Sequence, residues 1–150
     1  MINILKRLFP FLDCVSTEFS NNGWSTERKI EINDYSALLT SKNMKVFEEA
    51  KLFYSNIGDL LIIKNGAVQL DSRLMSFPGK DYNHTFYEEE AGQELCWVGN
   101  TESYLWGRGY LYIGVYGNCF VGTEKGDIYS NKLKGYSSLF GILNGNAKLV

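Results

Sequence analysis

Histidine and cysteine are scarce in this chain of 150 residues, and both shortages restrict the sites it can build. His84 is the only histidine, so this chain alone cannot form a site on two or more histidines. The three cysteines, Cys14, Cys96 and Cys119, are widely spaced and form no C-x-x-C pair. That pattern is poor for a zinc site and for a disulfide framework. We therefore expect buried, reduced thiols in a cytoplasmic protein, with no metal and no cofactor.

An excess of positive charge and long apolar runs are also missing. The chain has 15 basic and 17 acidic residues, which gives a net charge of −2. A nucleic-acid binder needs a basic face to displace counterions, so we expect no direct binding of nucleic acid. No window approaches the ~20 apolar residues of a membrane span. The apolar run 8–12 after Lys6-Arg7 is also shorter than the ~7–15 residues of a secretory segment, and we interpret it as a short helix or docking arm.

Apolar residues make up 45% of the chain, which is typical of one globular domain over residues 1–150. Apolar spacing predicts a helix over 35–40, capped by Asn33 or Asp34. A second apolar stripe runs from Val46 to Ile57, and Gly58 is expected as its left-handed C-cap. A short helix is also expected near 139–143.

Two β-hairpins are expected between these helices. The first covers 60–70, with Asn65-Gly66 as a type I′ turn, and the second covers 111–121, with its turn at 116–118. Residues 128–129 suggest a further strand, and the glycine-rich segment 101–109 is expected to be a long loop. Together the elements predict an α+β fold, mainly an antiparallel sheet packed against N-terminal and C-terminal helices.

The strongest local charge feature is the acidic run Glu88-Glu89-Glu90, with Asp81 before it and Glu94 after it. One interpretation is an acidic surface that meets a basic partner and speeds their encounter. The other is a solvated helix N-terminus, where carboxylates favour the helix dipole. Catalysis by a carboxylate pair is disfavoured, because adjacent glutamates on a helix point in different directions.

Aromatic residues supply candidate anchors for an interface and for the core. Tyr82 and Tyr87 precede the acidic run, and we expect them to contact a partner. Trp24 and Trp97 are expected in the core, whereas Trp106 in its glycine-rich segment is expected at the surface. Arg28 follows Trp24 by four residues and could stack on its indole or pair with a carboxylate.

A set of short motifs occurs in a fixed order over about residues 19–145. The set comprises an opening motif, a tyrosine-leucine helix, a step at the end of the long helix, a Gly-x-x-Leu-x-x-Val-Gly step and a late strand. The residues that carry them are Gly23, Trp24, Arg28 and Ile30; Tyr35 and Leu38; Tyr54, Gly58 and Leu60; Gly92, Leu95, Val98 and Gly99; Leu111, Ile113 and Gly117. This order resembles the SUKH superfamily, most closely its third family of bacterial toxin-immunity proteins. Cys96-Trp97 stand where relatives often carry a proline.

The resemblance implies a single SUKH-like domain and a non-enzymatic role. It implies a cytoplasmic immunity protein that neutralises a cognate secreted polymorphic toxin, often a nuclease or deaminase, by stoichiometric binding. The alternative is a SUKH-type regulatory or scaffolding module with an endogenous partner. No catalytic residue is implied, and the oligomeric state stays open. The expected partner-binding residues come from this sequence itself: Asp81, Tyr82, Tyr87, Glu88, Glu89, Glu90, Glu94 and Trp106. The expected structural residues are Gly23, Trp24, Arg28, Gly58, Gly99 and Gly117.

Overall fold

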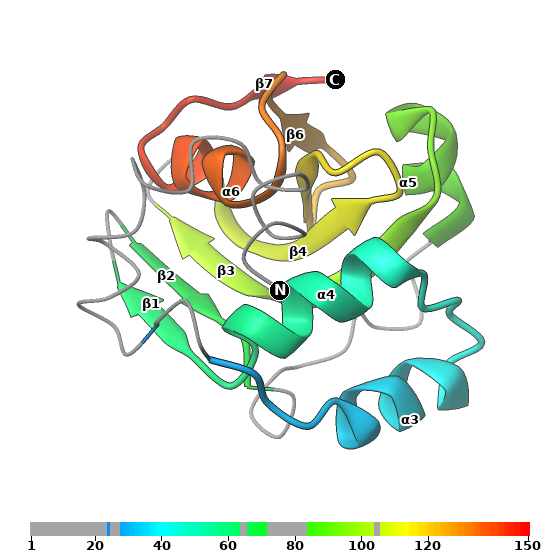
Figure 1. The fold of residues 1–150 in the computed structure, drawn as a ribbon. Helices are drawn as coiled ribbons and strands as arrows, with labels where there is room; N and C mark the ends of the chain where they lie inside the picture. The colour runs from blue at the N-terminus through cyan, green and yellow to red at the C-terminus, as the bar shows by residue number, and fades with distance from the viewer. Residues whose placement is uncertain (1–23, 25–27, 64–65, 72–83, 104–105) are drawn as a thin grey trace.

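The computed structural model of the chain describes residues 24, 28–63, 66–71, 84–103 and 106–150 (Figure 1). The described residues form an α+β fold, as the sequence predicts. Cys14, Gly23, Asp81, Tyr82 and the apolar run 8–12 lie outside them. None of the helices in the described ranges is long and apolar enough to cross a membrane.

One antiparallel sheet organises the fold, and each strand pairs with the next along the chain. Its strands are β1 (Leu61–Ile63), β2 (Gly66–Gln69), β3 (Leu95–Ser103), β4 (Gly107–Gly114), β5 (Cys119–Thr123), β6 (Ile128–Ser130) and β7 (Lys148–Leu149). Both expected hairpins and the strand at 128–129 are confirmed. The expected turn residue Asn65 lies outside the described residues, and Gly66 begins β2, where it pairs with Ser103 of β3.

The described helices are α3 (Asn33–Ser41), α4 (Glu48–Ile57), α5 (His84–Ala91) and α6 (Gly135–Leu143). Cys96, Ile113 and Cys119 pair in register and so share one face of the sheet. On that face the Cys96 Sγ lies 3.3 Å from the Tyr35 hydroxyl of α3, and the Cys119 Sγ lies 3.7 Å from the Gly135 carbonyl of α6. Figure 1 shows α4 and α6 in front of the sheet and α5 at its right-hand end.

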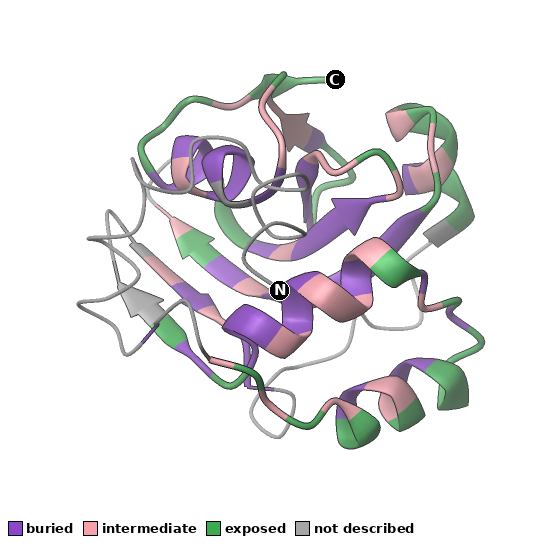
Figure 2. Ribbon diagram, viewed as in Figure 1, coloured by how far each residue is buried: buried purple, intermediate pink, exposed green. Residues whose placement is uncertain are grey.

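The middle strands are buried along most of their length, whereas α3 and α5 expose one side (Figure 2). The buried stripe of α4 contains Phe53, Tyr54 and Ile57, and it packs against β3 and β4. Trp97 is fully buried, as expected. The core therefore lies mainly between α4, α6 and the central strands.

The expected loop at 101–109 is wrong, because β3 and β4 extend through most of it as a hairpin. Thr101 pairs with Gly109, and Ser103 pairs with Gly107. A Cβ on Gly109 would lie 2.7 Å from Val121 Cγ1, so this glycine allows two strands to approach closely. Gly99 has a similar role at the end of the β-bulge between Trp97 and Gly99, since a Cβ on it would lie 2.6 Å from the Gln69 carbonyl oxygen.

Two helix ends also differ from expectation. Gly58 has a φ of −55°, and the left-handed residue is Asp59 with a φ of 62°. Glycine is needed at 58 for space, because a Cβ there would lie 2.5 Å from the Tyr54 ring. The N-cap of α3 is Ile32, so neither Asn33 nor Asp34 caps that helix. Gly117, with a φ of 92°, forms the β4–β5 turn as expected.

Trp24 is buried, with 4% of its surface exposed, which confirms its expected place in the core. Its Nε1 donates a hydrogen bond to the Asn56 Oδ1. The Arg28 Nη1 donates to the Asn56 carbonyl oxygen at 2.9 Å, which supports a structural role for Arg28. The opening motif is thus attached to α4 through hydrogen bonds as well as apolar contact.

We predict that Trp24→Ala lowers the free energy of unfolding by about 3–5 kcal/mol, because it empties a buried aromatic site. Tyr116→Ala is the control, since Tyr116 is 67% exposed and its loss should change stability by less than about 0.5 kcal/mol. Urea unfolding measures both variants. Equal midpoints for Trp24→Ala and the wild type would contradict the prediction.

Candidate partner-binding surface

The acidic run lies in the last turn of α5, so its expected place at a helix N-terminus is wrong. Gly92 ends the helix with a φ of 70°, and its N–H donates to the Glu88 carbonyl oxygen at 2.9 Å. The residues 88–90 therefore stand at the negative end of the helix dipole. A carboxylate there is unfavourable by about 0.3–1 kcal/mol when exposed.

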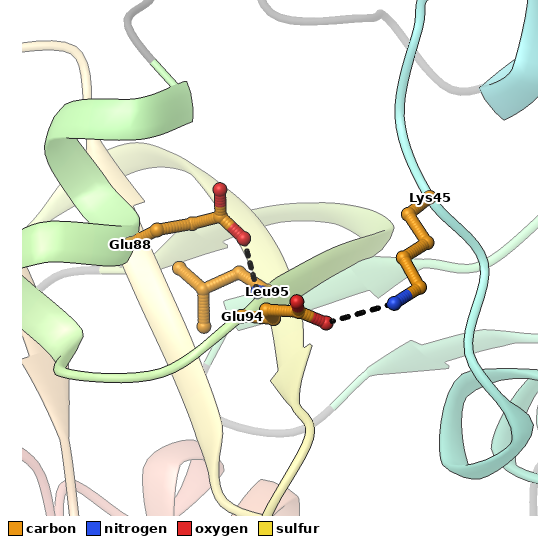
Figure 3. Close-up of polar contacts among 4 residues, drawn as sticks. All are labelled: Lys45, Glu88, Glu94 and Leu95. Atoms are coloured by element: carbon orange, nitrogen blue, oxygen red, sulfur yellow. Dashed lines mark hydrogen bonds and ion pairs between the residues drawn. The ribbon is translucent and has the colours of Figure 1, made fainter.

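Glu88 has a structural role that the sequence did not reveal. It is half-buried, and its Oε2 accepts a hydrogen bond at 2.9 Å from the buried N–H of Leu95 (Figure 3). This bond fixes the end of α5 to the start of β3. One carboxylate oxygen of Glu88 is thus engaged within the fold, and its contact with a partner stays a prediction.

Glu89, Glu90 and Glu94 are exposed and remain candidates for contact with a partner. Glu94 forms an ion pair with Lys45 at 3.6 Å, drawn in Figure 3. Both side chains are mostly exposed, so this pair contributes little to stability. Within the described residues, Glu89 and Glu90 have neither an ion pair nor a side-chain hydrogen bond.

Tyr87 is buried, with 5% of its surface exposed, so its expected contact with a partner is wrong. Its hydroxyl donates to the Thr123 carbonyl oxygen at 2.7 Å. A Cβ on Gly122 would lie 3.2 Å from the Tyr87 ring, so the ring packs directly on β5. Tyr87 attaches α5 to the sheet face opposite to α3 and α6, and it positions the exposed glutamates.

Two further carboxylates lie near the point where Tyr87 attaches α5 to the sheet, and the sequence pattern did not predict their place there. Glu124 and Asp127 are exposed at the β5–β6 turn, and α5 packs against β6. Burial raises the pKa of Tyr87, and the nearby Tyr110 and Asp127 raise it further. Burial also raises the pKa of Tyr110; the nearby Glu124 raises it further, whereas Arg108 lowers it. We define the acidic surface as Glu89, Glu90, Glu94, Glu124 and Asp127.

Trp106 is half-buried and not freely exposed, so its expected place at the surface is only partly correct. Its ring lies 5.7 Å from that of Tyr129. It lines a hollow of about 430 Å³ together with the acidic Glu124 and Asp127 and the basic Arg108 and Lys125. Trp106 therefore adjoins the acidic surface, although it does not project from it.

The two described cysteines are buried and reduced, as expected. Burial raises the pKa of Cys96 from 9.0 to about 12, and burial has the same effect on Cys119. Both thiols are therefore protonated at neutral pH and are poor nucleophiles. Within the described ranges, no group of His, Cys, Asp and Glu side chains is arranged to hold a metal ion.

Comparisons of the chain with protein-family models, with curated proteins and with solved structures found no match. The resemblance to the SUKH superfamily therefore remains a prediction based on the order of the motifs.

We predict that Glu88→Ala lowers the free energy of unfolding by about 1–3 kcal/mol, because the buried Leu95 N–H loses its acceptor. Glu89→Ala is the matched control, and its stability should stay within about 0.5 kcal/mol of the wild type. Chemical denaturation of the two variants provides the test. A Glu88→Ala protein as stable as Glu89→Ala would rule out the structural role of Glu88.

We also predict that stability falls as pH rises from about 9 to about 12. Thiols of the unfolded chain ionise near pH 9, whereas those of the folded chain stay protonated up to about pH 12. The stabilising contribution is therefore complete below pH 9 and is lost towards pH 12, by up to about 1.4 kcal/mol per pH unit for each thiol. Urea unfolding across this range should show that the free energy of unfolding falls less steeply with pH in the double variant Cys96→Ala/Cys119→Ala than in the wild type. Identical slopes would contradict the assignment.

Proposed function

We propose that this chain is an immunity protein that neutralises a cognate toxin by stoichiometric binding, with the acidic surface covering a basic cleft of that toxin. The site of action is the cytoplasm of the cell that makes both proteins. The chain acts as a binder and not as a catalyst.

The observation that carries this proposal is the position of Glu89 and Glu90 at the C-terminal end of α5. Carboxylates there oppose the helix dipole, and within the described residues neither has an ion pair or side-chain hydrogen bond to compensate. The run does not lie at a helix N-terminus, a position that would have explained it without a partner. Charged side chains that are placed unfavourably and make no stabilising contact are typical of a surface that binds another molecule.

The acidic surface has the features of a rigid binding surface. Tyr87 and Glu88 attach α5 to β5 and β3 through hydrogen bonds of 2.7 and 2.9 Å. The backbone that carries the glutamates is therefore ordered before binding, which reduces the conformational entropy lost on association. The β5–β6 turn adds the carboxylates of Glu124 and Asp127, with Lys125 between them and Arg108 beside them.

A partner of matching chemistry carries lysine and arginine side chains in a concave site. Nucleases and other enzymes that act on nucleic acid have such clefts, because they bind phosphate groups. Carboxylates placed in the cleft would occupy the positions of those phosphates and exclude the substrate. Charge complementarity of this kind raises the association rate and fixes orientation.

We predict that Glu89→Gln/Glu90→Gln slows association with the toxin about threefold to tenfold at low salt, while the dissociation rate changes little. The rates should converge at high salt, where exposed charges are screened. The matched control is Glu48→Gln/Glu49→Gln, which removes the same charge from the first turn of α4. The partner for the measurement is the product of the neighbouring gene.

Rapid-mixing or surface-based kinetics can follow both variants at two ionic strengths. Equal slowing by the two variants would show that only net charge matters. An unchanged rate for Glu89→Gln/Glu90→Gln would show that the toxin docks elsewhere.

A further inference from the structure

A second charged surface, of opposite sign, lies between the β4–β5 turn, the β6–α6 connection and β7. It is a hollow of about 860 Å³, and its charged lining residues are all lysines. No Asp or Glu lies among the described residues that line it. We name it the lysine hollow and define it by Lys132, Lys134, Lys148, Asn118, Asn131 and Asn146.

Side-chain amides hold the wall of the lysine hollow in place. The Asn118 Nδ2 donates to the Leu133 carbonyl oxygen at 2.9 Å, and the Asn131 Nδ2 donates to that of Asn146 at 2.9 Å. The Lys134 Nζ donates to the Asn118 Oδ1 at 3.0 Å. Lys132 and Lys148 are exposed and have no ion pair within the described part of the chain. The wall of the hollow is therefore preformed, and it presents two lysine ammonium groups that have no ion pair among the described residues.

Strand β7 borders the lysine hollow and is the outermost strand on this side of the described sheet. The Val150 N–H donates to the Ile128 carbonyl oxygen at 3.0 Å, so residue 150 directs its backbone towards β6. Backbone direction alternates along an antiparallel strand, and the N–H and C=O of Leu149 therefore point away from β6. The Leu149 side chain is 62% exposed. This edge offers backbone groups for a further strand.

We propose that the lysine hollow and the β7 edge together bind an extended acidic segment of a partner protein. The segment adds a strand beside β7 through the backbone of Leu149. Lys148 pairs with Ser130, which pairs with Phe120, so the side chains of these three residues share one sheet face. Side chains alternate between faces with a period of two, so every second residue of the added strand faces the lysines. A segment with carboxylates at alternate positions fits this arrangement.

The surroundings favour a protein segment over nucleic acid. The apolar Leu133, Leu149 and Val150 also line the hollow and offer contacts for the apolar residues of a peptide. This proposal does not depend on what the acidic surface binds.

The test titrates the isotope-labelled full chain with a short synthetic peptide in which glutamate and valine alternate. We expect amide shifts at Leu149 and at the side chains of Asn118 and Asn131. Lys132→Gln/Lys148→Gln should weaken binding about fivefold, as expected for the loss of two exposed ion pairs. Lys29→Gln/Lys42→Gln removes the same charge elsewhere and should leave the affinity unchanged. Equal weakening by the two pairs would overturn the proposal.

A second pair of variants tests the added strand. Leu149→Pro removes the outward N–H but not the bond from Val150 to Ile128, whereas Leu149→Ala keeps that N–H. We expect Leu149→Pro to abolish the peptide shifts and Leu149→Ala to retain them. Equal binding by both variants would exclude strand addition. Pyrophosphate producing the same shifts as the peptide would show an anion site and would overturn the proposal.

Discussion

The buried side chain of Asn56 is the contact on which the attachment of the N-terminal motif depends. Asn56 is 2% exposed, and its carboxamide accepts a hydrogen bond from Trp24 and donates one to the Arg28 carbonyl oxygen at 2.9 Å. Its own carbonyl oxygen accepts from Arg28. An apolar residue at position 56 would remove two of these bonds at once. The free energy of unfolding would fall by more than the net contribution of the two hydrogen bonds, because buried polar groups would lose their partners.

Helix α4, which carries Asn56, is also connected to the sheet. Tyr54 of α4 stacks on Tyr35 of α3, with ring centroids 3.8 Å apart. The Tyr35 hydroxyl donates to the Trp97 carbonyl oxygen at 2.5 Å, beside the bulge in β3. Burial raises the pKa of Tyr35 well above its ordinary value, so the hydroxyl keeps its proton and remains a donor. The opening motif, two helices and the bulged strand thus form one connected layer.

The sequence predicted those elements whose apolar pattern is unambiguous. The stripe from Val46 to Ile57 and the alternation from Leu111 to Val115 each fit one periodicity only. Two of the errors in the fold came from glycines, whose sequence signal does not separate flexibility from close packing. Gly58 was expected to supply a positive φ, but it provides room for the Tyr54 ring. Gly109 was expected in a loop, but it lies between Thr101 and Val121 within paired strands.

The candidate site was predictable in charge but not in orientation. The acidic run is evident from composition, whereas the sides of α5 that face solvent depend on where the helix begins and ends. No periodic apolar pattern around 84–91 indicates which side of the helix faces the sheet. Tyr87 and Glu88 were therefore assigned to the surface, although Tyr87 bonds to β5 and Glu88 bonds to the first residue of β3. Glu124 and Asp127 were missed because only the path of the sheet brings the β5–β6 turn next to α5.

The placement of polar amides between the two charged surfaces explains how both can persist in one small domain. Opposite charges in contact would pair with each other and would be lost for binding. Here Glu94 pairs with Lys45, whereas Lys134 donates a hydrogen bond to the amide oxygen of Asn118, which also lies 3.5 Å from the Gln93 Nε2. An amide accepts this bond without cancelling the charge of the ammonium group. Lys134 therefore keeps its positive charge. A partner that touched both surfaces would be restricted to one orientation, because the reversed orientation would bring like charges together.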